Sequence, residues 1–356
     1  MEKKLKKLPL DVNIETSKIL KQLSDTSRAL AELKGVAKAM PNQNVLINAI
    51  MINEAKSSSK IENIVTTHDE IYRAMVKQQD ASYAAKEVVD YRTAVWRGYE
   101  LIKEKGMINT NIIIDVQKKL EHNEAGIRSV PGTVIKNTLT DEVVYTPPQE
   151  KEEILEYMKN LEDYINSEED GVDPLIKLAM IHYQFESIHP FYDGNGRTGR
   201  ILNILYLVLK GLIDAPILYL SKYIIKNKLE YYELFQKTRE TEDFEDWVIY
   251  FLVGIEEMSK ETICIINKIR EEILKMKYEL REKTKIYTKE LLEALFFEFY
   301  TKIPYIQEQL GVSDKTAQKY LDTLVELGFL TSEKVGRERI YKNERLFNII
   351  KETDEK

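Results

Sequence analysis

Apolar residues recur three to four positions apart through most of the first 105 residues, which is the spacing of amphipathic helices. The pattern runs through residues 15–40, 44–64 and 80–106. It breaks at Pro41 and Asn42 and again near Gly106. We therefore expect the N-terminal part of the chain to be helical.

The pattern changes at Ile127, where β-branched runs flank a polar stretch at residues 137–141 and two prolines follow at 147 and 148. Such an arrangement predicts a β-hairpin in an otherwise helical region. Helical periodicity returns in three further stretches, at residues 151–169, 174–188 and 197–213.

Helical spacing then continues from residue 227 to residue 285, and the last part of this stretch is rich in charged residues. Residues 287–343 follow a different order of helix, helix, a turn at 310–314, and a third helix capped by Ser313 or Asp314. A two-stranded wing around Gly336 completes the order of a winged helix-turn-helix domain.

Composition narrows the class of protein. The 356 residues are 43% hydrophobic and 31% charged, with a formal net charge of −7, which describes a globular chain and argues against a protein that coats nucleic acid. No apolar run is long enough to span a bilayer, and no apolar segment follows the first lysines, so we expect a cytoplasmic protein. The single cysteine, Cys264, is expected to be a buried small residue, and with four histidines it disfavours a structural zinc site.

The stretch His189-Pro-Phe-Tyr-Asp-Gly-Asn-Gly-Arg-Thr-Gly-Arg200 concentrates the candidate chemistry. Gly194, Gly196 and Gly199 permit close approach by a ligand, and the helix that follows presents its free N–H groups and positive dipole end to the same space. Such a place binds phosphate.

The charged and polar residues of this stretch add to the same picture. Arg197 and Arg200 supply planar donors that match phosphate oxygens, and Asn195 can donate a side-chain N–H into the cradle. Asp193 offers the hard oxygen ligand that Mg²⁺ prefers beside phosphates. His189 can accept a proton at neutral pH, so the residues predict nucleotide, metal and a general base.

The stretch matches every specified position of His-x-Phe-x-Asp/Glu-Gly-Asn-Gly-Arg-x-x-Arg and thereby resembles the Fic family of protein adenylyltransferases. The resemblance implies transfer of AMP from ATP to a Ser, Thr or Tyr hydroxyl of a target protein or of the enzyme itself, with release of pyrophosphate. His189 would be the base, Asp193 would hold Mg²⁺, and Phe191 would anchor the loop. The remaining nucleotide-binding residues would be Gly194, Asn195, Gly196, Arg197, Thr198, Gly199 and Arg200, with Arg200 meeting the γ-phosphate.

Family variation leaves other donors open. Doc-like relatives carry lysine in place of the second glycine of the cradle and phosphorylate their targets, whereas this chain has Gly196 followed by Arg197. Phosphoryl transfer is therefore disfavoured. Transfer of UMP or phosphocholine is excluded less firmly.

A second motif, Ser58-x-x-x-Glu62-Asn63, resembles the inhibitory signature of self-inhibited Fic proteins. On a helix Ser58 and Glu62 would share one face. A carboxylate that reached Arg200 would occupy its donors and repel the γ-phosphate. In some relatives the same glutamate positions a water that removes AMP, so de-AMPylation is a further alternative.

The resemblance also assigns the hairpin and a tyrosine pair. The hairpin resembles the family's flap, which holds the target segment as an added strand, and Val134, Ile135 and Lys136 would line the nucleotide pocket. Tyr231 and Tyr232 match a pair that contacts the nucleoside in relatives, although core packing explains them equally well. Arg239 stands where some relatives have an asparagine.

The winged helix suggests DNA, with Lys315, Gln318 and Lys319 on the third helix and Arg337 and Arg339 in the wing. Between residues 285 and 350, however, Lys and Arg together number ten, the same as Asp and Glu together. A basic footprint is absent, so docking of the target protein is favoured over DNA. A homodimer is suggested by family habit alone.

We therefore expect a mainly α-helical Fic-fold bundle with a β-hairpin flap and a C-terminal winged helix-turn-helix domain. The expected boundaries are an N-terminal helical region with the inhibitory motif at 1–105, a catalytic core at 106–260, a helical connector at 261–284 and the winged helix at 285–356. The alternative function is a DNA-binding regulator whose Fic domain senses nucleotide.

Overall fold

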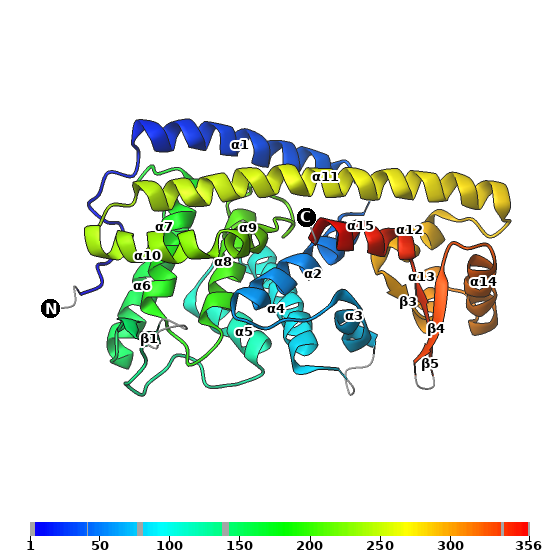
Figure 1. Cartoon of the computed structure of the whole chain (residues 1–356), viewed down its shortest axis with the longest axis horizontal. Helices are drawn as coiled ribbons and strands as arrows, with labels where there is room; N and C mark the ends of the chain where they lie inside the picture. The colour runs from blue at the N-terminus through cyan, green and yellow to red at the C-terminus, as the bar shows by residue number, and fades with distance from the viewer. Residues whose placement is uncertain (1–3, 41, 77–80, 137–141, 336–337, 355–356) are drawn as a thin grey trace. The chain divides into compact units, whose positions relative to one another are not determined.

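The computed structural model describes residues 4–40, 42–76, 81–136, 142–335 and 338–354, and their elements are drawn in Figure 1. The chain divides into two compact units. One consists of residues 1–34 and 54–259, and the other of residues 35–53 and 260–356. The division falls within α1 (Ser17–Lys38), α2 (Gln43–Ile61) and α11 (Glu245–Lys283).

The first unit is helical apart from one small hairpin. Its other elements are α3 (His68–Val76), α4 (Tyr83–Lys105), α5 (Thr110–Glu121), β1 (Ile135–Lys136), β2 (Val143–Tyr145), α6 (Lys151–Asn166), α7 (Pro174–Ile188), α8 (Asn195–Leu209), α9 (Leu220–Lys226) and α10 (Lys228–Thr241). The hairpin predicted from the change of pattern at Ile127 is confirmed, with strands shorter than the β-branched runs.

Local signals explain where the helices begin and end. Ser82 caps α4 by accepting a hydrogen bond from the Ala85 N–H, and Gly106 ends it in the left-handed conformation at φ 65°. Asn109 then caps α5 through the Ile112 N–H. The predicted break at Gly106 is therefore confirmed.

Helices α7 and α8 form the centre of this unit. Nearly every side chain of both is buried, and the apolar residues of α7 are spread around the helix and not gathered on one face, as expected of a helix enclosed by others. α8 packs against α7, α4 and α5, and α6 packs against α7. Trp247 of α11, fully buried, donates its indole N–H to the Ala179 carbonyl at 2.9 Å. The motif loop thus connects the two most enclosed helices.

The second unit has the predicted winged helix-turn-helix order. Its elements are α12 (Lys289–Phe297), β3 (Tyr300–Thr301), α13 (Ile303–Leu310), α14 (Asp314–Glu326), β4 (Thr331–Val335), β5 (Glu338–Lys342) and α15 (Glu344–Asp354). The strands form an antiparallel sheet in the order β3-β5-β4. Ser313 caps α14 through the Thr316 N–H, and Asn53 donates to the Ile350 carbonyl at 3.1 Å.

The residues that suggested DNA binding differ in their surroundings. Lys315, Gln318 and Lys319 are exposed on α14. Arg339 is paired with Asp322, at 2.8 Å, and its guanidinium also donates to the Ser332 hydroxyl. Arg337 and Gly336 lie outside the described residues. One of the two wing arginines is therefore neutralised by a neighbouring carboxylate.

Cys264 is exposed, so the expectation of a buried small residue is wrong. It lies on a face of α11 that turns away from the apolar contacts of Ile263 and Ile265.

Among the helices of the described ranges, none combines the length and the apolar character needed to cross a membrane.

Candidate active site

The loop between α7 and α8 is closed by its own side chains. His189 ends α7 in the left-handed conformation, at φ 48°, and its N–H is bonded to the Phe185 carbonyl at 3.0 Å. Phe191 is fully buried beneath the loop. Asn195 accepts from the Phe191 N–H and donates to the Phe191 carbonyl, both at 2.8 Å. The Asn195 amide therefore shapes the loop. Its N–H group is not directed into the anion cradle, which is the position that the sequence suggests for it.

The three motif glycines have different roles. Gly194 precedes α8 at φ 77° and is the one of the three that needs a left-handed conformation. Its carbonyl accepts the buried Thr198 N–H at 2.9 Å. A Cβ at Gly196 would collide with Glu62, and one at Gly199 would collide with Glu186. Close approach at Gly196 and Gly199 is thus made by protein carboxylates.

Arg200 is held by the motif of Ser58, Glu62 and Asn63. Its Nη2 donates to Glu62 Oε1 at 2.8 Å and to the Ser58 carbonyl at 3.0 Å, and its Nε donates to Ser58 Oγ at 2.8 Å. Arg200 is only 4% exposed. Asn63, the last motif residue, adopts φ 62°, and Lys228 bonds the Ile61 carbonyl at 2.6 Å. The end of α2 is thereby fixed against the first turns of α8.

The pair perturbs both ionisable groups. Burial by itself would raise the pKa of Glu62, but the charge and hydrogen bond of Arg200 outweigh it and lower that pKa. Burial would lower the pKa of Arg200, and Glu62 reverses the effect. Both groups are consequently charged around neutral pH.

Arg197 has a separate set of carboxylate partners. Its Nη1 bonds Glu87 of α4 and its Nη2 bonds Glu121 of α5 at 2.6 Å, and Arg197 is 4% exposed. Burial raises the pKa of Glu121 to about 7 despite the attraction of Arg197. Although the two arginines share one helical turn, the structure directs their guanidinium groups to different acids.

His189 is half-buried and lies beside a buried arginine that the sequence did not single out. Arg128, fully buried, donates from Nε to the His189 carbonyl at 2.8 Å and from Nη2 to the Ile188 and Pro148 carbonyls. Burial, reinforced by the charge of Arg128, lowers the pKa of His189 to about 4. The imidazole is therefore neutral at physiological pH and able to accept a proton.

Asp193 is exposed at the entrance of the loop, and its Oδ1 accepts the Gly194 N–H at 2.7 Å. No group of three or more potential ligands that could enclose a metal occurs within the described residues. Mg²⁺ commonly binds through one or two carboxylates and completes its shell with water and substrate phosphates. A single exposed carboxylate beside a phosphate cradle fits that habit.

The hairpin begins close to the motif loop. Ile135 pairs with Tyr145 and Lys136 with Val143, with a bulge between them, and the Tyr145 hydroxyl donates to the Ser187 carbonyl at 3.0 Å. Val134 and Val143 are exposed at 39% and 52%. The turn at residues 137–141 lies outside the described residues.

The two tyrosines differ in environment. Tyr231 is 6% exposed, its hydroxyl lies 2.9 Å from Nε2 of buried His182, and its ring packs on Trp247. Tyr232 is 49% exposed. Core packing accounts for Tyr231, whereas Tyr232 keeps an open face. Arg239 stacks on Tyr145, with 3.6 Å between the guanidinium carbon and the ring centre.

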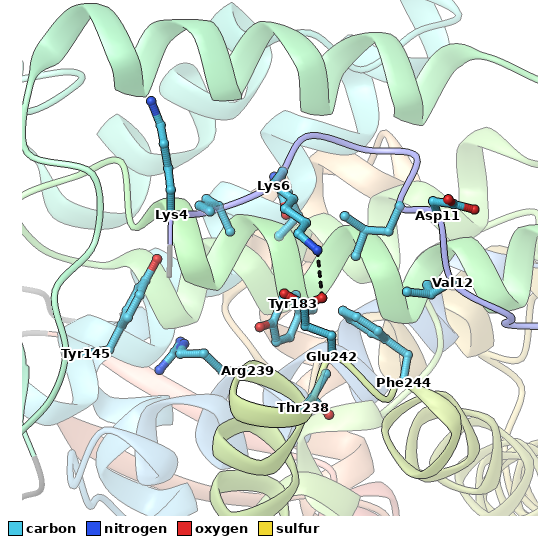
Figure 2. Close-up of a pocket in the computed structure, with 13 residues that line it drawn as sticks. Lys4, Lys6, Asp11, Val12, Tyr145, Tyr183, Thr238, Arg239, Glu242 and Phe244 are labelled. Atoms are coloured by element: carbon cyan, nitrogen blue, oxygen red, sulfur yellow. Dashed lines mark hydrogen bonds and ion pairs between the residues drawn. The ribbon is translucent and has the colours of Figure 1, made fainter. Parts of the chain in front are cut away.

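A cavity of about 120 Å³ lies away from the phosphate cradle, between the N-terminal segment and α7 and α10. Figure 2 shows Lys6 directed at Glu242, with which it forms an ion pair, and Arg239 near Tyr145. None of the residues predicted for nucleotide binding lines it. The cavity therefore does not define the candidate site.

Four acidic or basic residues around the motif were missed by sequence reasoning, namely Glu87, Glu121, Arg128 and Glu186. Glu87 and Glu121 lie on helices whose periodic pattern explains an acidic residue as a surface residue. Glu186, three residues before His189, is the one that proximity to the motif could have indicated.

Three family models match the chain. Fic/DOC family N-terminal covers residues 20–100, Fic/DOC family covers residues 107–207, and Protein adenylyltransferase SoFic-like, C-terminal domain covers residues 273–346. With the site and fold described above, these matches show that the chain belongs to the Fic/DOC family.

Individual relatives agree with this assignment. The chain is 31% identical over 138 residues to Protein adenylyltransferase fic-1 of Caenorhabditis elegans, covering 37% of this chain and 24% of that protein. It is 46% identical over 56 residues to Probable protein adenylyltransferase aq_aa38 of Aquifex aeolicus, covering 16% of this chain and 18% of that protein. The matches thus span about a quarter or less of these relatives' lengths.

Solved structures support the fold. A Fic family protein from Desulfovibrio desulfuricans G20 is similar with a TM-score of 0.59 at 18% identity, over 94% of this chain and 97% of that one. A segment of Fic-1 from C. elegans is similar with a TM-score of 0.53 at 21% identity, over 72% and 74%. The predicted mainly α fold with a small flap is confirmed.

Proposed function

We propose that this chain is a protein adenylyltransferase that transfers AMP from ATP to a hydroxyl of a target protein and of itself. The observation that carries the proposal is the neutral His189 held beside the N-terminal turn of α8, within the full Fic motif. The names of the relatives, both protein adenylyltransferases, support the same activity.

The reaction needs few groups. His189 takes the proton from the attacking Ser, Thr or Tyr hydroxyl, whose oxygen bonds to the α-phosphorus as the bond to the β-phosphate oxygen breaks and pyrophosphate leaves. The N–H groups at the start of α8 and the Arg200 guanidinium hold the phosphates. Positioning and electrostatic stabilisation supply most of the rate in such transfers.

Mg²⁺ belongs to this proposal through Asp193. When bound, the ion would offset phosphate charge, and Asp193 would be its ligand from the protein. The exposed position of the carboxylate beside the cradle supports this role.

Glu62 acts as a brake on the same site. Its carboxylate uses a donor of Arg200 and lies against Gly196, so its negative charge lies where phosphate oxygens would bind. Nucleotide binding in a productive pose therefore requires α2 to release Arg200. Removal of AMP with help from Glu62 is compatible with the same contact and remains an alternative.

The target is proposed to bind along the flap. The exposed Val134 and Val143 offer apolar contact next to strand edges, and an added strand would register a hydroxyl opposite His189. Docking of the target on the winged helix and formation of a homodimer remain predictions.

Intact-mass spectrometry after incubation with ATP and Mg²⁺, with UTP and CTP in parallel, tests the proposal. We expect an added AMP mass that is larger for Glu62→Gly than for the unaltered protein and that is lost when His189→Ala is added. No adduct from any nucleotide would contradict it, and would favour the DNA-binding regulator. A UMP or CMP adduct in place of AMP would correct the donor.

A further inference from the structure

Glu186 is a carboxylate that the proposed reaction leaves unused. It lies on α7 one turn before His189, and its Oε1 is buried with no hydrogen-bond partner in the part of the chain that the structure describes. A Cβ on Gly199 would collide with this oxygen, so the carboxylate lies directly against the first turns of α8. Burial raises the pKa of Glu186 to about 7.

The surroundings of Glu186 are those of the candidate site. Arg200 and Glu62 both act on it electrostatically, and Glu186 in turn acts on the hydroxyls of Tyr231 and Tyr232. Arg200 directs its Nε and Nη2 to Ser58 and Glu62. The carboxylate therefore lies against the first turns of α8 and is near enough to Tyr232 to raise the pKa of its hydroxyl.

A buried carboxylate oxygen without a donor destabilises the folded state, and native proteins seldom retain one without a use. If Glu186 had only a structural role, its Oε1 would be expected to accept a hydrogen bond from the protein. Position 199 would then not need a glycine to make room for the carboxylate. The arrangement is explained if the missing donor arrives with the ligand.

We propose that Glu186 accepts a hydrogen bond from the nucleoside part of the bound nucleotide, either from a sugar hydroxyl or from an amino group of the base. This inference rests on the proposed function, which makes the ligand a nucleotide. At pH 8, above its pKa of about 7, Glu186 is a carboxylate that can only accept, and the phosphate chain, which also carries acceptors, cannot satisfy it. The hydroxyl and amino groups are the donors that ATP offers.

Isothermal titration calorimetry tests the inference without relying on transfer. The background is Glu62→Gly with His189→Ala, which opens the site and prevents turnover, and the ligands are ATP, 2′-deoxy-ATP, 3′-deoxy-ATP and inosine triphosphate with Mg²⁺. Loss of the donor that contacts Glu186 should weaken binding about 10-fold to 100-fold, because hydrogen bonds to charged groups contribute about 1.5–3 kcal/mol.

The discrimination between ATP and the analogue that lacks the donor should disappear in Glu186→Leu, which keeps the volume but removes the acceptor. Glu186→Gln should retain part of this discrimination. A penalty confined to a deoxy analogue identifies the sugar, and one confined to inosine triphosphate identifies the base. Equal binding of all four ligands with Glu186 intact, or unchanged discrimination in Glu186→Leu, would overturn the inference.

Two controls separate the possible failures. If ATP does not bind even with Glu186 intact, the proposed function fails together with the inference, whereas binding with unchanged discrimination removes the inference alone. If Glu186→Leu does not fold by circular dichroism, Gly199→Ala in the same background displaces the carboxylate without removing it. It should reduce discrimination in the same way, and unaltered discrimination there would again overturn the inference.

Discussion

The Nε of Arg128 donates a hydrogen bond to the carbonyl of His189 at 2.8 Å. The same guanidinium bonds Pro148, at the far end of the hairpin segment, and Ile188. One buried cation thereby connects the proposed base to both the end of α7 and the base of the flap. The geometry of His189 depends on a residue 61 positions away in the chain.

Replacing Arg128 by Gln should lower stability and change the pH dependence of transfer. Buried carbonyls would lose their donor, at a cost of about 2–4 kcal/mol in the free energy of unfolding. Loss of the positive charge would also raise the pKa of His189, so the acidic limb of the pH–rate profile should move to higher pH. Urea unfolding and intact-mass assays between pH 4 and 8, in the Glu62→Gly protein, measure both.

Arg128→Lys is the matched control because it keeps the charge but not the fork of donors. Its acidic limb should stay near that of the parent even if its rate falls. A limb that moves equally in the Lys and Gln variants would contradict the electrostatic part of the prediction.

The parent enzyme itself should remain active at unusually low pH for a histidine base. A base is lost when it is protonated, and the pKa of His189 is about 4 instead of the ordinary 6.5. Transfer by Glu62→Gly should therefore show no loss attributable to His189 between pH 7 and about 5. An acidic limb centred near pH 6.5 would show that His189 is solvated in the active state.

Replacing Glu121 by Gln should affect stability and ATP affinity in opposite directions. The change weakens the hold on buried Arg197, and because the pKa of Glu121 is raised to about 7, the cost in unfolding free energy should be smaller at pH 8 than at pH 5. At pH 8, where Glu121 is ionised, the change also removes a negative charge beside Gly194, so ATP should bind more tightly. Denaturant unfolding and calorimetry, both in the Glu62→Gly background, test the two parts.

Asp115→Asn is the control for Glu121, because it breaks the Arg97–Asp115 pair, whose side chains are 40% and 35% exposed. Exposed pairs contribute about 0–1 kcal/mol, so little change is expected. Weaker ATP binding in Glu121→Gln would indicate that the acid positions Arg197 for phosphate.

Glu186→Gln should become more stable relative to the parent as pH rises. The pKa of Glu186 is about 7 in the folded chain against 4.5 ordinarily, so the folded state binds the extra proton between these values. Stability from that proton is present below about pH 4.5 and is lost as pH rises through 7. The unfolding free energy of Glu186→Gln relative to that of the parent, measured in urea, should therefore be higher at pH 8 than at pH 5.

The exposed Glu152→Gln serves as the comparison for Glu186→Gln and should show no such shift. A difference that is independent of pH in both variants would mean that Glu186 is not proton-linked to folding. Buried His182 and half-buried His189, with pKa values of about 3 and 4, act in the opposite sense and cancel in the comparison because both variants retain them.

Asp193→Asn should raise the Mg²⁺ concentration needed for half-maximal transfer, because one ligand loses its charge. Titration of Mg²⁺ in the Glu62→Gly background measures the shift, with nucleotide held constant. Unchanged metal dependence would exclude Asp193 as a ligand. ATP binding without metal should change little, because the Asp193 side chain is exposed and solvent screens its interaction with the phosphates.

Much of the fold could be predicted from sequence because the deciding interactions are local. Caps at Ser82, Asn109 and Ser313, the left-handed Gly106, and the change of period at Ile127 all act within a few residues. The motif loop is local in the same sense, because Asn195 and Phe191 close it across four positions.

The partners of the motif residues were decided by tertiary structure. Nothing in the periodicity of α4 or α5 distinguishes Glu87 and Glu121 from other acidic residues, and they meet Arg197 only because both helices pack against α8. Arg128 and Glu186 are likewise defined by what surrounds them. Cys264 shows the converse, since its apolar neighbours in sequence did not place it inside.

The sequence by itself determined the motif, the order of the helices, the flap and the winged helix, because spacing and capping are short-range properties of the chain. Tertiary structure decided which carboxylate neutralises which arginine, why His189 is neutral, and why the Oε1 of Glu186 has no hydrogen-bond partner among the residues described. Burial and the distance between charges govern those properties, and both depend on residues that are far apart in the sequence.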